Sequence, residues 1–406
     1  VILDMKTHYI FKIVGLSFFL SLTGILSGFG QVNVENTLWD DEDFLLTPEY
    51  EVVKSDSIES IIFKSLSYKG HRKSVFAYYA TPGMLDGNIS GDKKLPGIIL
   101  VHGGGGMAFR DWVVQWAKRG YAALALDTRG NGADKKHIAG GFEEKGGETP
   151  YFDVTLPLKE QWLYQAVGDV IKAHTLLLSF PEVDKKRTAI TGISWGGVLT
   201  CIVSSLDARF KVAVPVYGCG FLGESGRMKQ QLDALAEKDR DTWLAQYDPS
   251  VYLSRMKRPI LFLNGTNDVH FYLSSMTRSA ALAKKSRLLI KRGLRHSHKY
   301  GWSNEEISAF VNQYLGKEEA LPCIRKESIG NGVVKGQVSS PVSIEKVTLY
   351  YTTSEGAVAD TYHWRSVSGD LYGRNWEVTV PDGAKIWFVN LTDTRGYQIS
   401  GKVYRR

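Results

Sequence analysis

Residues 188–203 read TAITGISWGGVLTCIV, and this stretch decides the fold class. An apolar run of strand length, 188–191, leads into Gly-Ile-Ser194-Trp195-Gly, and a helical stretch follows. A serine on such a strand-to-helix turn is held in a strained backbone conformation, and the glycines around it remove Cβ atoms that would clash. Its hydroxyl then projects above the sheet, at the positive end of the helix. The alternative is a glycine-rich turn without chemistry, but the strand and helix on either side favour a nucleophile at Ser194.

The surrounding sequence predicts a mostly parallel sheet flanked by helices. Apolar runs lie at 97–101, 121–126, 188–191, 212–216, 260–263 and 287–290, and helical stretches lie near 108–118, 160–179, 195–206, 228–246, 271–284 and 303–315. Continuous apolar strands that alternate with helices are typical of a parallel sheet covered on both faces. Two earlier runs, 61–68 and 74–80, predict an antiparallel opening. The fold class is therefore α/β.

The helical period disappears beyond about residue 325. Short alternating strands at 347–352, 376–380 and 385–389 replace it, separated by turn residues such as Pro381-Asp-Gly. This pattern predicts a small C-terminal all-β sandwich over residues 325–406, after the main α/β domain over residues 58–318. Residues 31–57 are expected to form an acidic N-terminal extension, irregular at least as far as residue 55.

The first thirty residues have the layout of a secretory signal peptide. Lys6, His8 and Lys12 form a positive region, an apolar run follows from residue 13, and small residues lead to Gly30. A membrane anchor helix is the alternative, but serine, threonine and glycine interrupt the apolar run. We expect cleavage near Gly30, a secreted or periplasmic location and no stable insertion into a membrane.

Composition excludes several classes of function. Of the 406 residues, 43% are hydrophobic and 23% charged, which is typical of a globular protein. The formal charge is +7, but no dense Lys/Arg block is interleaved with aromatic residues, so we expect no nucleic-acid partner. The three cysteines, Cys201, Cys219 and Cys323, have neither metal-ligand nor redox spacing. The sequence therefore predicts no metal site, and the proposed chemistry needs no cofactor.

An acid and a base are expected after the nucleophile, in the order Ser, Asp, His. Asp268 follows the run 260–263 and is the candidate acid, although capping a helix is a common alternative role for aspartate. Two histidines, His296 and His298, follow the last apolar run. We select His296 as the base because it comes sooner after the strand, and His298 remains the alternative.

A glycine run predicts an oxyanion hole. His102-Gly103-Gly104-Gly105-Gly106 follows the run 97–101, and its backbone N–H groups can point at a substrate oxygen. One such donor is worth roughly 3–4 kcal/mol in acyl transfer. We assign the donors to Gly104 and to Trp195, the residue after the nucleophile. A phosphate-binding loop is the alternative, but the run lacks the GK[ST] ending. His102 itself is expected to brace the loop.

These motifs carry a resemblance to a known superfamily. The segments VHGGGG, TGISWGGVLTCIV, LNGTND and LRHSH, within residues 60–316, resemble the α/β-hydrolase superfamily. Within it, the sequence is similar to secreted bacterial acetylxylan-esterase-like and dienelactone-hydrolase-like enzymes, and to the prolyl-oligopeptidase group. The resemblance implies Ser194, Asp268 and His296 as nucleophile, acid and base. It also implies cleavage of carboxylic esters, with acetyl groups on plant polysaccharide as the substrate.

Two other functions remain open. A serine peptidase of the prolyl-oligopeptidase type is one, although the repeats of the gating propeller are absent from the sequence. A non-catalytic binding module is the other, but such a module needs neither the Ser194/Asp268/His296 set nor an oxyanion loop. The expected partner is thus a small or carbohydrate ester.

Overall fold

The computed structural model describes residues 37–143, 149–316, 318–354 and 359–406. The expected signal peptide, residues 1–30, lies outside these residues, and so do residues 31–36 of the expected N-terminal extension. Residues 38–406 form one compact unit. Among the described helices, none is both long enough and apolar enough to span a membrane.

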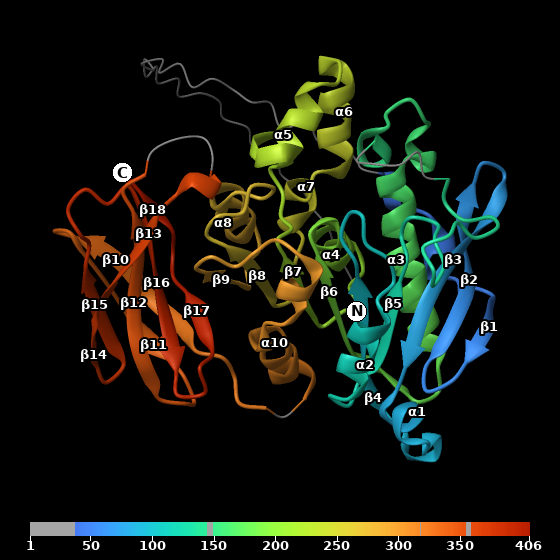
Figure 1. The fold of residues 1–406 in the computed structure, drawn as a ribbon, viewed down its shortest axis with the longest axis horizontal. Coiled ribbons are helices and arrows are strands. Elements are labelled where there is room, and N and C mark those ends of the chain that lie inside the picture. The colour runs from blue at the N-terminus through green and yellow to red at the C-terminus, as the bar shows by residue number, and fades with distance from the viewer. Residues whose placement is uncertain (1–36, 144–148, 317, 355–358) are drawn as a thin grey trace, which may run out of the picture. The chain divides into compact units, whose positions relative to one another are not determined.

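A mixed sheet forms the centre of this unit, as Figure 1 shows. Its first part runs in the order β1 (Tyr50–Ser55), β2 (Glu59–Tyr68), β3 (His71–Ala80), β5 (Ala122–Leu126), β4 (Leu95–Val101), β6 (Val183–Ile193), β7 (Val212–Val216), β8 (Ile260–Gly265) and β9 (Ser286–Lys291). The strands β5, β4, β6, β7, β8 and β9 are parallel to one another. The strands β1, β2 and β3 are antiparallel to their neighbours. The predicted parallel sheet with an antiparallel opening is confirmed.

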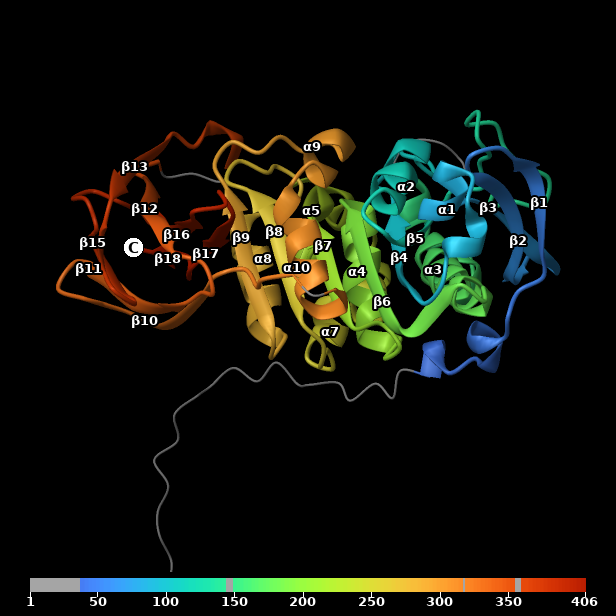
Figure 2. The same ribbon diagram turned by 90° about the horizontal axis from the view of Figure 1, so that it is seen from below.

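Helices cover both faces of this sheet. They are α1 (Pro82–Asp86), α2 (Arg110–Ala117), α3 (Trp162–Ser179), α4 (Trp195–Leu206), α5 (Gly226–Asp233), α6 (Glu237–Tyr247), α7 (Ser250–Leu253), α8 (Leu273–Leu282), α9 (His298–Trp302) and α10 (Glu305–Leu315). Helices α2 and α10 lie on one face, and α3, α4 and α8 pack on the other (Figure 2). The parallel strands β4, β5, β7 and β8 are buried along nearly their whole length, which explains their continuous apolar sequence.

The C-terminal region is all-β, as predicted, and its strands form two layers. One layer, β10 (Cys323–Gly330), β11 (Val333–Ser339), β15 (Asn375–Thr379) and β14 (Asp370–Tyr372), is a separate antiparallel sheet. The other layer, β17 (Gln398–Ser400), β16 (Ile386–Asp393), β12 (Ile344–Thr352) and β13 (Trp364–Ser368), with β18 (Tyr404–Arg405) beside β16, extends the central sheet. The junction is antiparallel, with Ser400 of β17 opposite Leu288 of β9, and the two strands lie side by side in Figures 1 and 2. The C-terminal tryptophans Trp364, Trp376 and Trp387 are buried core residues.

Two local predictions were wrong. Residues 50–55 were expected to be irregular, but they form β1, the outermost strand of the central sheet. All six side chains of β1 are exposed, so no buried face imposes an alternating pattern on the sequence. The single helix expected near 228–246 is two helices, because the Leu235 N–H donates to the Leu232 carbonyl in a tight turn after α5.

Candidate active site

Ser194 occupies a strained turn between β6 and α4. Its backbone angles are φ 59° and ψ −117°, a region that costs a non-glycine residue about 1–3 kcal/mol. The turn is held by the Ser194 N–H, which donates to the Val216 carbonyl at 2.8 Å. A Cβ on Gly196 would lie 2.1 Å from the Val101 carbonyl oxygen, so only glycine lets α4 approach β4 this closely. The side chain of Ser194 is partly exposed at the carboxyl edge of the sheet.

Asp268 and His296 are in direct contact. The His296 Nδ1 lies 2.6 Å from one carboxylate oxygen of Asp268, and the side chains are 20% and 1% exposed. The other carboxylate oxygen accepts the N–H groups of His270 and Phe271 at 2.8 and 2.9 Å. Asp268 therefore contacts the predicted histidine and holds the turn that follows it, but it does not cap a helix, because α8 begins only at Leu273 with Tyr272 at its N-cap. Because Nδ1 faces the carboxylate, Nε2 of His296 is left to handle a proton.

The ring of His296 connects this pair to the serine turn. It packs against Tyr217, with centroids 4.6 Å apart, and Tyr217 follows the residue whose carbonyl holds the Ser194 N–H. On another side the centroid of the His270 ring is 4.5 Å away. Burial, and the neighbouring His296, lower the pKa of His270 to about 4, so His270 is neutral at neutral pH.

Ser194 makes no hydrogen bond to His296 within the part of the chain that the structure describes. In active sites without a substrate such contacts are often long, and they tighten when the substrate binds. Ser194, Asp268 and His296 follow the strands β6, β8 and β9, so all three lie at the same edge of the sheet. The assignment of their catalytic roles stays a prediction.

His298, the alternative base, makes a different contact. Its Nε2 accepts the backbone N–H of Gly103 at 2.9 Å, and its ring packs against Phe109 with centroids 4.7 Å apart. Burial lowers the pKa of His298 to about 4. His298 is also the first residue of α9, whose cap is Ser297, and this short helix was not expected from the sequence. The structure therefore places His298 against the glycine loop and His296 against Asp268.

The glycine loop lies directly on the serine turn. A Cβ on Gly103 would be 2.9 Å from the Cβ of Ser194, and one on Gly104 would be 2.9 Å from the ring of Trp195. The two predicted oxyanion donors, Gly104 and Trp195, are consequently neighbours. His102 braces this loop: its Nδ1 donates to the Gly103 carbonyl at 2.7 Å, and its Nε2 accepts the Thr128 N–H at 3.0 Å.

An aromatic wall beside the glycine loop was not assigned from the sequence. The ring of Trp195 is only 3% exposed and stacks on Tyr151, with centroids 4.5 Å apart. Phe152 and Trp162 contact the same indole edge-on. A Cβ on Gly104 would also lie 3.0 Å from the Tyr151 hydroxyl. Trp195 is therefore a packed core residue. Tyr151 ends a long glycine-rich segment of the sequence, and the tertiary fold brings it against Trp195.

A buried carboxyl behind the loop was also missed. One oxygen of Asp127 accepts the N–H groups of Arg129 and Asn131, each at 2.8 Å, and the other lies 3.6 Å from Nε2 of His102. Burial raises the pKa of Asp127 to about 6, and burial lowers that of His102 to about 4. His102 is therefore neutral at neutral pH, whereas Asp127 takes up its proton only as the pH falls toward about 6.

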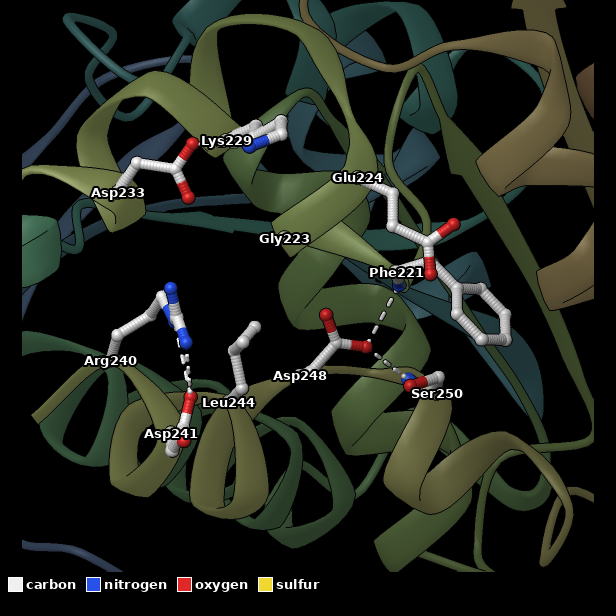
Figure 3. Close-up of a pocket in the computed structure, with 10 residues that line it drawn as sticks. All are labelled: Phe221, Gly223, Glu224, Lys229, Asp233, Arg240, Asp241, Leu244, Asp248 and Ser250. Carbon is white, nitrogen blue, oxygen red and sulfur yellow. Dashed lines mark hydrogen bonds and ion pairs between the residues drawn. The ribbon is translucent and has the colours of Figure 1, made fainter. Parts of the chain in front are cut away.

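A cavity of about 410 Å³ lies elsewhere, between α5 and α6 (Figure 3). It is lined by Phe221, Gly223, Glu224, Lys229, Asp233, Arg240, Asp241, Leu244, Asp248 and Ser250. Asp248 points toward the backbone at its base and accepts the N–H groups of Phe221, Leu222 and Ser250. None of the predicted site residues lines this cavity. Among the described residues, no group of three or more His, Cys, Asp and Glu is placed to hold a metal ion.

Comparison with known proteins identifies the fold. The chain superposes on an acetyl xylan esterase from Paenibacillus sp. R4 with a TM-score of 0.54 and 22% identity, covering 66% of this chain and 89% of that one. Acetyl xylan esterase 1 from Thermoanaerobacterium sp. JW/SL YS485 gives a TM-score of 0.53 and 18% identity, with coverages of 66% and 89%. At these identities the likeness concerns the fold, and it confirms the predicted α/β-hydrolase class.

Two curated relatives are peptidases by name. The uncharacterized peptidase YuxL of Bacillus subtilis (strain 168) is 27% identical over 199 residues, and dipeptidyl aminopeptidase BIII of Pseudoxanthomonas mexicana is 23% identical over 307 residues. The alignments cover 46% and 68% of this chain but 28% and 40% of the relatives, so the chain spans less than half of either. A family match covers more: residues 35–251, just over half of the chain, match the acetyl xylan esterase (AXE1) family. With this match on an α/β-hydrolase fold, the chain belongs to the acetyl xylan esterase (AXE1) family.

Proposed function

We propose that this protein is a serine hydrolase of carboxylic esters that removes acetyl groups from an acylated polysaccharide such as acetylxylan. The observation that carries the proposal is the 2.6 Å contact between His296 and Asp268, at the sheet edge where Ser194 occupies its strained turn. A serine, a histidine and a buried aspartate in this arrangement activate a hydroxyl for attack on a carbonyl carbon. Membership of the acetyl xylan esterase family supports the same chemistry.

The reaction follows from these roles. Ser194 Oγ attacks the carbonyl carbon of the ester while His296 Nε2 accepts the hydroxyl proton. Asp268 stabilises the resulting imidazolium through its contact with Nδ1. The backbone N–H groups of Gly104 and Trp195 receive the negative charge that develops on the carbonyl oxygen. The bond from the carbonyl carbon to the alcohol oxygen then breaks, and His296 returns the proton to the departing alcohol.

Water completes the cycle. His296 removes a proton from a water molecule, which attacks the acyl carbon on Ser194. The bond to Ser194 Oγ breaks, the serine regains its proton from His296, and the carboxylic acid leaves.

The aromatic wall supports a small acyl group. The Tyr151 hydroxyl and the Trp195 ring both lie within 3.0 Å of the position that a Cβ on Gly104 would take. Because both rings pack tightly on each other and on Trp162, they leave little room next to the oxyanion donors. An acetyl group fits this restriction better than a long acyl chain does.

The test is acetate release from acetylated xylan, beside hydrolysis of p-nitrophenyl acetate, by wild type and Ser194→Ala. We expect the wild type to cleave both substrates and the variant to lose at least about 10⁴-fold in kcat while remaining folded. Aminoacyl p-nitroanilides form the third arm. Cleavage of these amides without release of acetate would contradict the esterase proposal and favour the peptidase alternative.

We propose further that the protein acts outside the cytoplasm. The support is the sequence of residues 1–30 alone, which has the layout of a cleaved secretory signal. N-terminal sequencing of the protein from fractionated cells of its natural host is the test. A mature protein that begins near residue 31 in the exported fraction is expected, and an uncleaved precursor in the cytosol would contradict the proposal.

A further inference from the structure

The C-terminal region makes contact with the loop that carries the candidate acid. The Asn267 side chain, next to Asp268, donates from Nδ2 to the carbonyls of Ala359 at 3.0 Å and Tyr362 at 2.9 Å. Both carbonyls belong to the connection between β12 and β13, where η7 (Ala359–Thr361) lies. A side chain beside the acid is thus bonded to the C-terminal region, far away in the sequence.

Asn267 is also linked to the loop of the candidate base. The Thr266 hydroxyl donates to Asn267 Oδ1 at 2.7 Å and accepts the Gly293 N–H at 3.0 Å. Gly293 follows β9 and lies in the same loop as His296. The hydrogen bonds therefore run from the C-terminal region through Asn267 and Thr266 to the two loops that hold Asp268 and His296.

A second contact fixes β9, the strand that leads to His296. The Ile290 N–H donates to the Ser400 hydroxyl at 2.7 Å, and the Ile290 carbonyl accepts the Asn390 side-chain amide at 2.9 Å. Ser400 also donates to Asn390 Oδ1 at 2.6 Å. Both side chains are buried, so they replace a stretch of strand pairing at the junction of β9 and β17.

From these contacts we propose that Asn267 is a positioning residue, through which the C-terminal β region holds Asp268 at its distance from His296. The proposal rests on the proposed function, since it gives Asp268 the role of the acid. A displacement of about 1 Å at a catalytic group can cost on the order of 100-fold in rate, so a clamp of this kind has a measurable effect.

The experiment compares full-length wild type, Asn267→Ala, Thr266→Val and Arg395→Ala. Arg395 is the matched control, because it also joins the C-terminal region to the rest of the chain: it donates to the Glu319 and Ala320 carbonyls at 2.9 Å, away from the acid loop. For Asn267→Ala we expect kcat on p-nitrophenyl acetate to fall about 10- to 100-fold with KM within about twofold. Thr266→Val is expected to act in the same direction. Arg395→Ala is expected to lower Tm and to leave kcat unchanged.

The pH profile separates positioning from simple stability. Asp268 stabilises the imidazolium form of His296 through their contact, so a looser Asp268 shifts the pH profile of kcat/KM, which a loss of stability alone does not. Two other titratable side chains, Tyr217 and His270, pack against the His296 ring, and His298 interacts with it electrostatically. The four proteins retain all three. The same shift is measured without substrate by titrating ¹⁵N-labelled histidines by NMR, with His296 assigned from its substitution by Gln.

The outcomes are distinct. A drop in kcat together with a shifted pH profile in Asn267→Ala, absent in Arg395→Ala, supports the proposal. If Asn267→Ala lowers Tm but leaves kcat and the pH profile as in wild type, the proposal is overturned. If Asn267→Ala does not fold, Asn267→Ser, which keeps one donor, is judged by the same criteria. Loss of the proposed function would appear separately, as a wild type without esterase activity, and the NMR titration would still decide the role of Asn267.

Discussion

At the scale of single residues, the two histidines of the HSH sequence, His296 and His298, make different contacts. They are two positions apart, yet His296 contacts the Asp268 carboxylate and His298 accepts the Gly103 N–H. Spacing alone could not separate them, because both follow the same strand in the loop where a base is expected. The distinction arises from α9, which begins at His298 and turns that side chain toward the glycine loop.

Substitution of each histidine by alanine should therefore give unequal losses. His296→Ala removes the proposed general base, and kcat should fall by at least about 10⁴-fold. His298→Ala leaves the Gly103 N–H without its acceptor, and an unsatisfied group of this kind costs about 1–3 kcal/mol. Because this group belongs to the glycine loop, we expect kcat to fall by about 10- to 100-fold. His298→Gln keeps a carbonyl acceptor and should recover part of it. Equal losses for the two alanine variants in steady-state kinetics would mean that the base is not His296 alone.

Asp127 gives the fold a measurable pH dependence. Burial raises its pKa from 3.8 to about 6, so the folded state favours the protonated carboxyl. This contribution to stability is complete below pH 3.8 and is lost as the pH rises through about 6. Two pKa units correspond to on the order of 3 kcal/mol.

Asp127→Asn stays neutral at every pH and keeps an oxygen for the Arg129 and Asn131 N–H groups. The free energy of unfolding of the variant, relative to wild type, should therefore increase by roughly 2–3 kcal/mol between pH 4 and pH 8. Urea unfolding at a series of pH values measures this difference. A difference that is constant with pH would show that the carboxyl does not titrate in this range.

At the scale of elements, the strands that surround Ser194 were predictable because they are buried on both faces. Runs such as 212–216 and 260–263 are continuous and apolar, and β7 and β8 occupy those residues. The edge strand β1 was not predictable, since its side chains are all exposed and polar and apolar residues follow no period. The contacts within the aromatic wall around Tyr151 were not predictable for another reason: its residues come from separate elements, and only the tertiary fold brings them together.

The contact between α4 and β4 depends on one glycine. A Cβ on Gly196 would meet the carbonyl oxygens of Val101 at 2.1 Å and His102 at 2.6 Å, both backbone atoms that cannot move aside cheaply. Gly196→Ala should therefore lower the free energy of unfolding by about 3 kcal/mol or more and abolish the proposed esterase activity. Gly330→Ala is the control, because that position on β10 has open space around it and should change stability by under about 0.5 kcal/mol. A stable Gly196→Ala protein in urea unfolding would mean that α4 can shift without loss of the fold.

At the scale of the whole described unit, the sequence predicts the α/β region and the all-β region better than it predicts the junction between them. The change from helical to strand pattern near residue 325 marks the all-β region correctly. Nothing local indicates that Ser400 pairs with Leu288, because this contact joins strands that are distant in the sequence. The boundary between domains at residues 318–325 therefore stays a prediction, and the continuous sheet across it raises the question of whether the two regions unfold separately.

The buried junction favours a single unfolding transition. Asn390 and Ser400 saturate both backbone groups of Ile290, and the Gln398 N–H donates to Glu306 on α10 at 3.1 Å. Separation of the regions would leave these polar groups without partners, at a cost of about 1–3 kcal/mol for each group that stays buried. We expect calorimetry of the wild type to give one transition, with equal calorimetric and van't Hoff enthalpies. Asn390→Ala should lower its Tm by about 2 °C or more, because the loss weakens the junction shared by both regions. Two resolved transitions in the wild type would instead mean that the C-terminal region folds by itself, and that the hydrogen bonds at β9 join two independent cores.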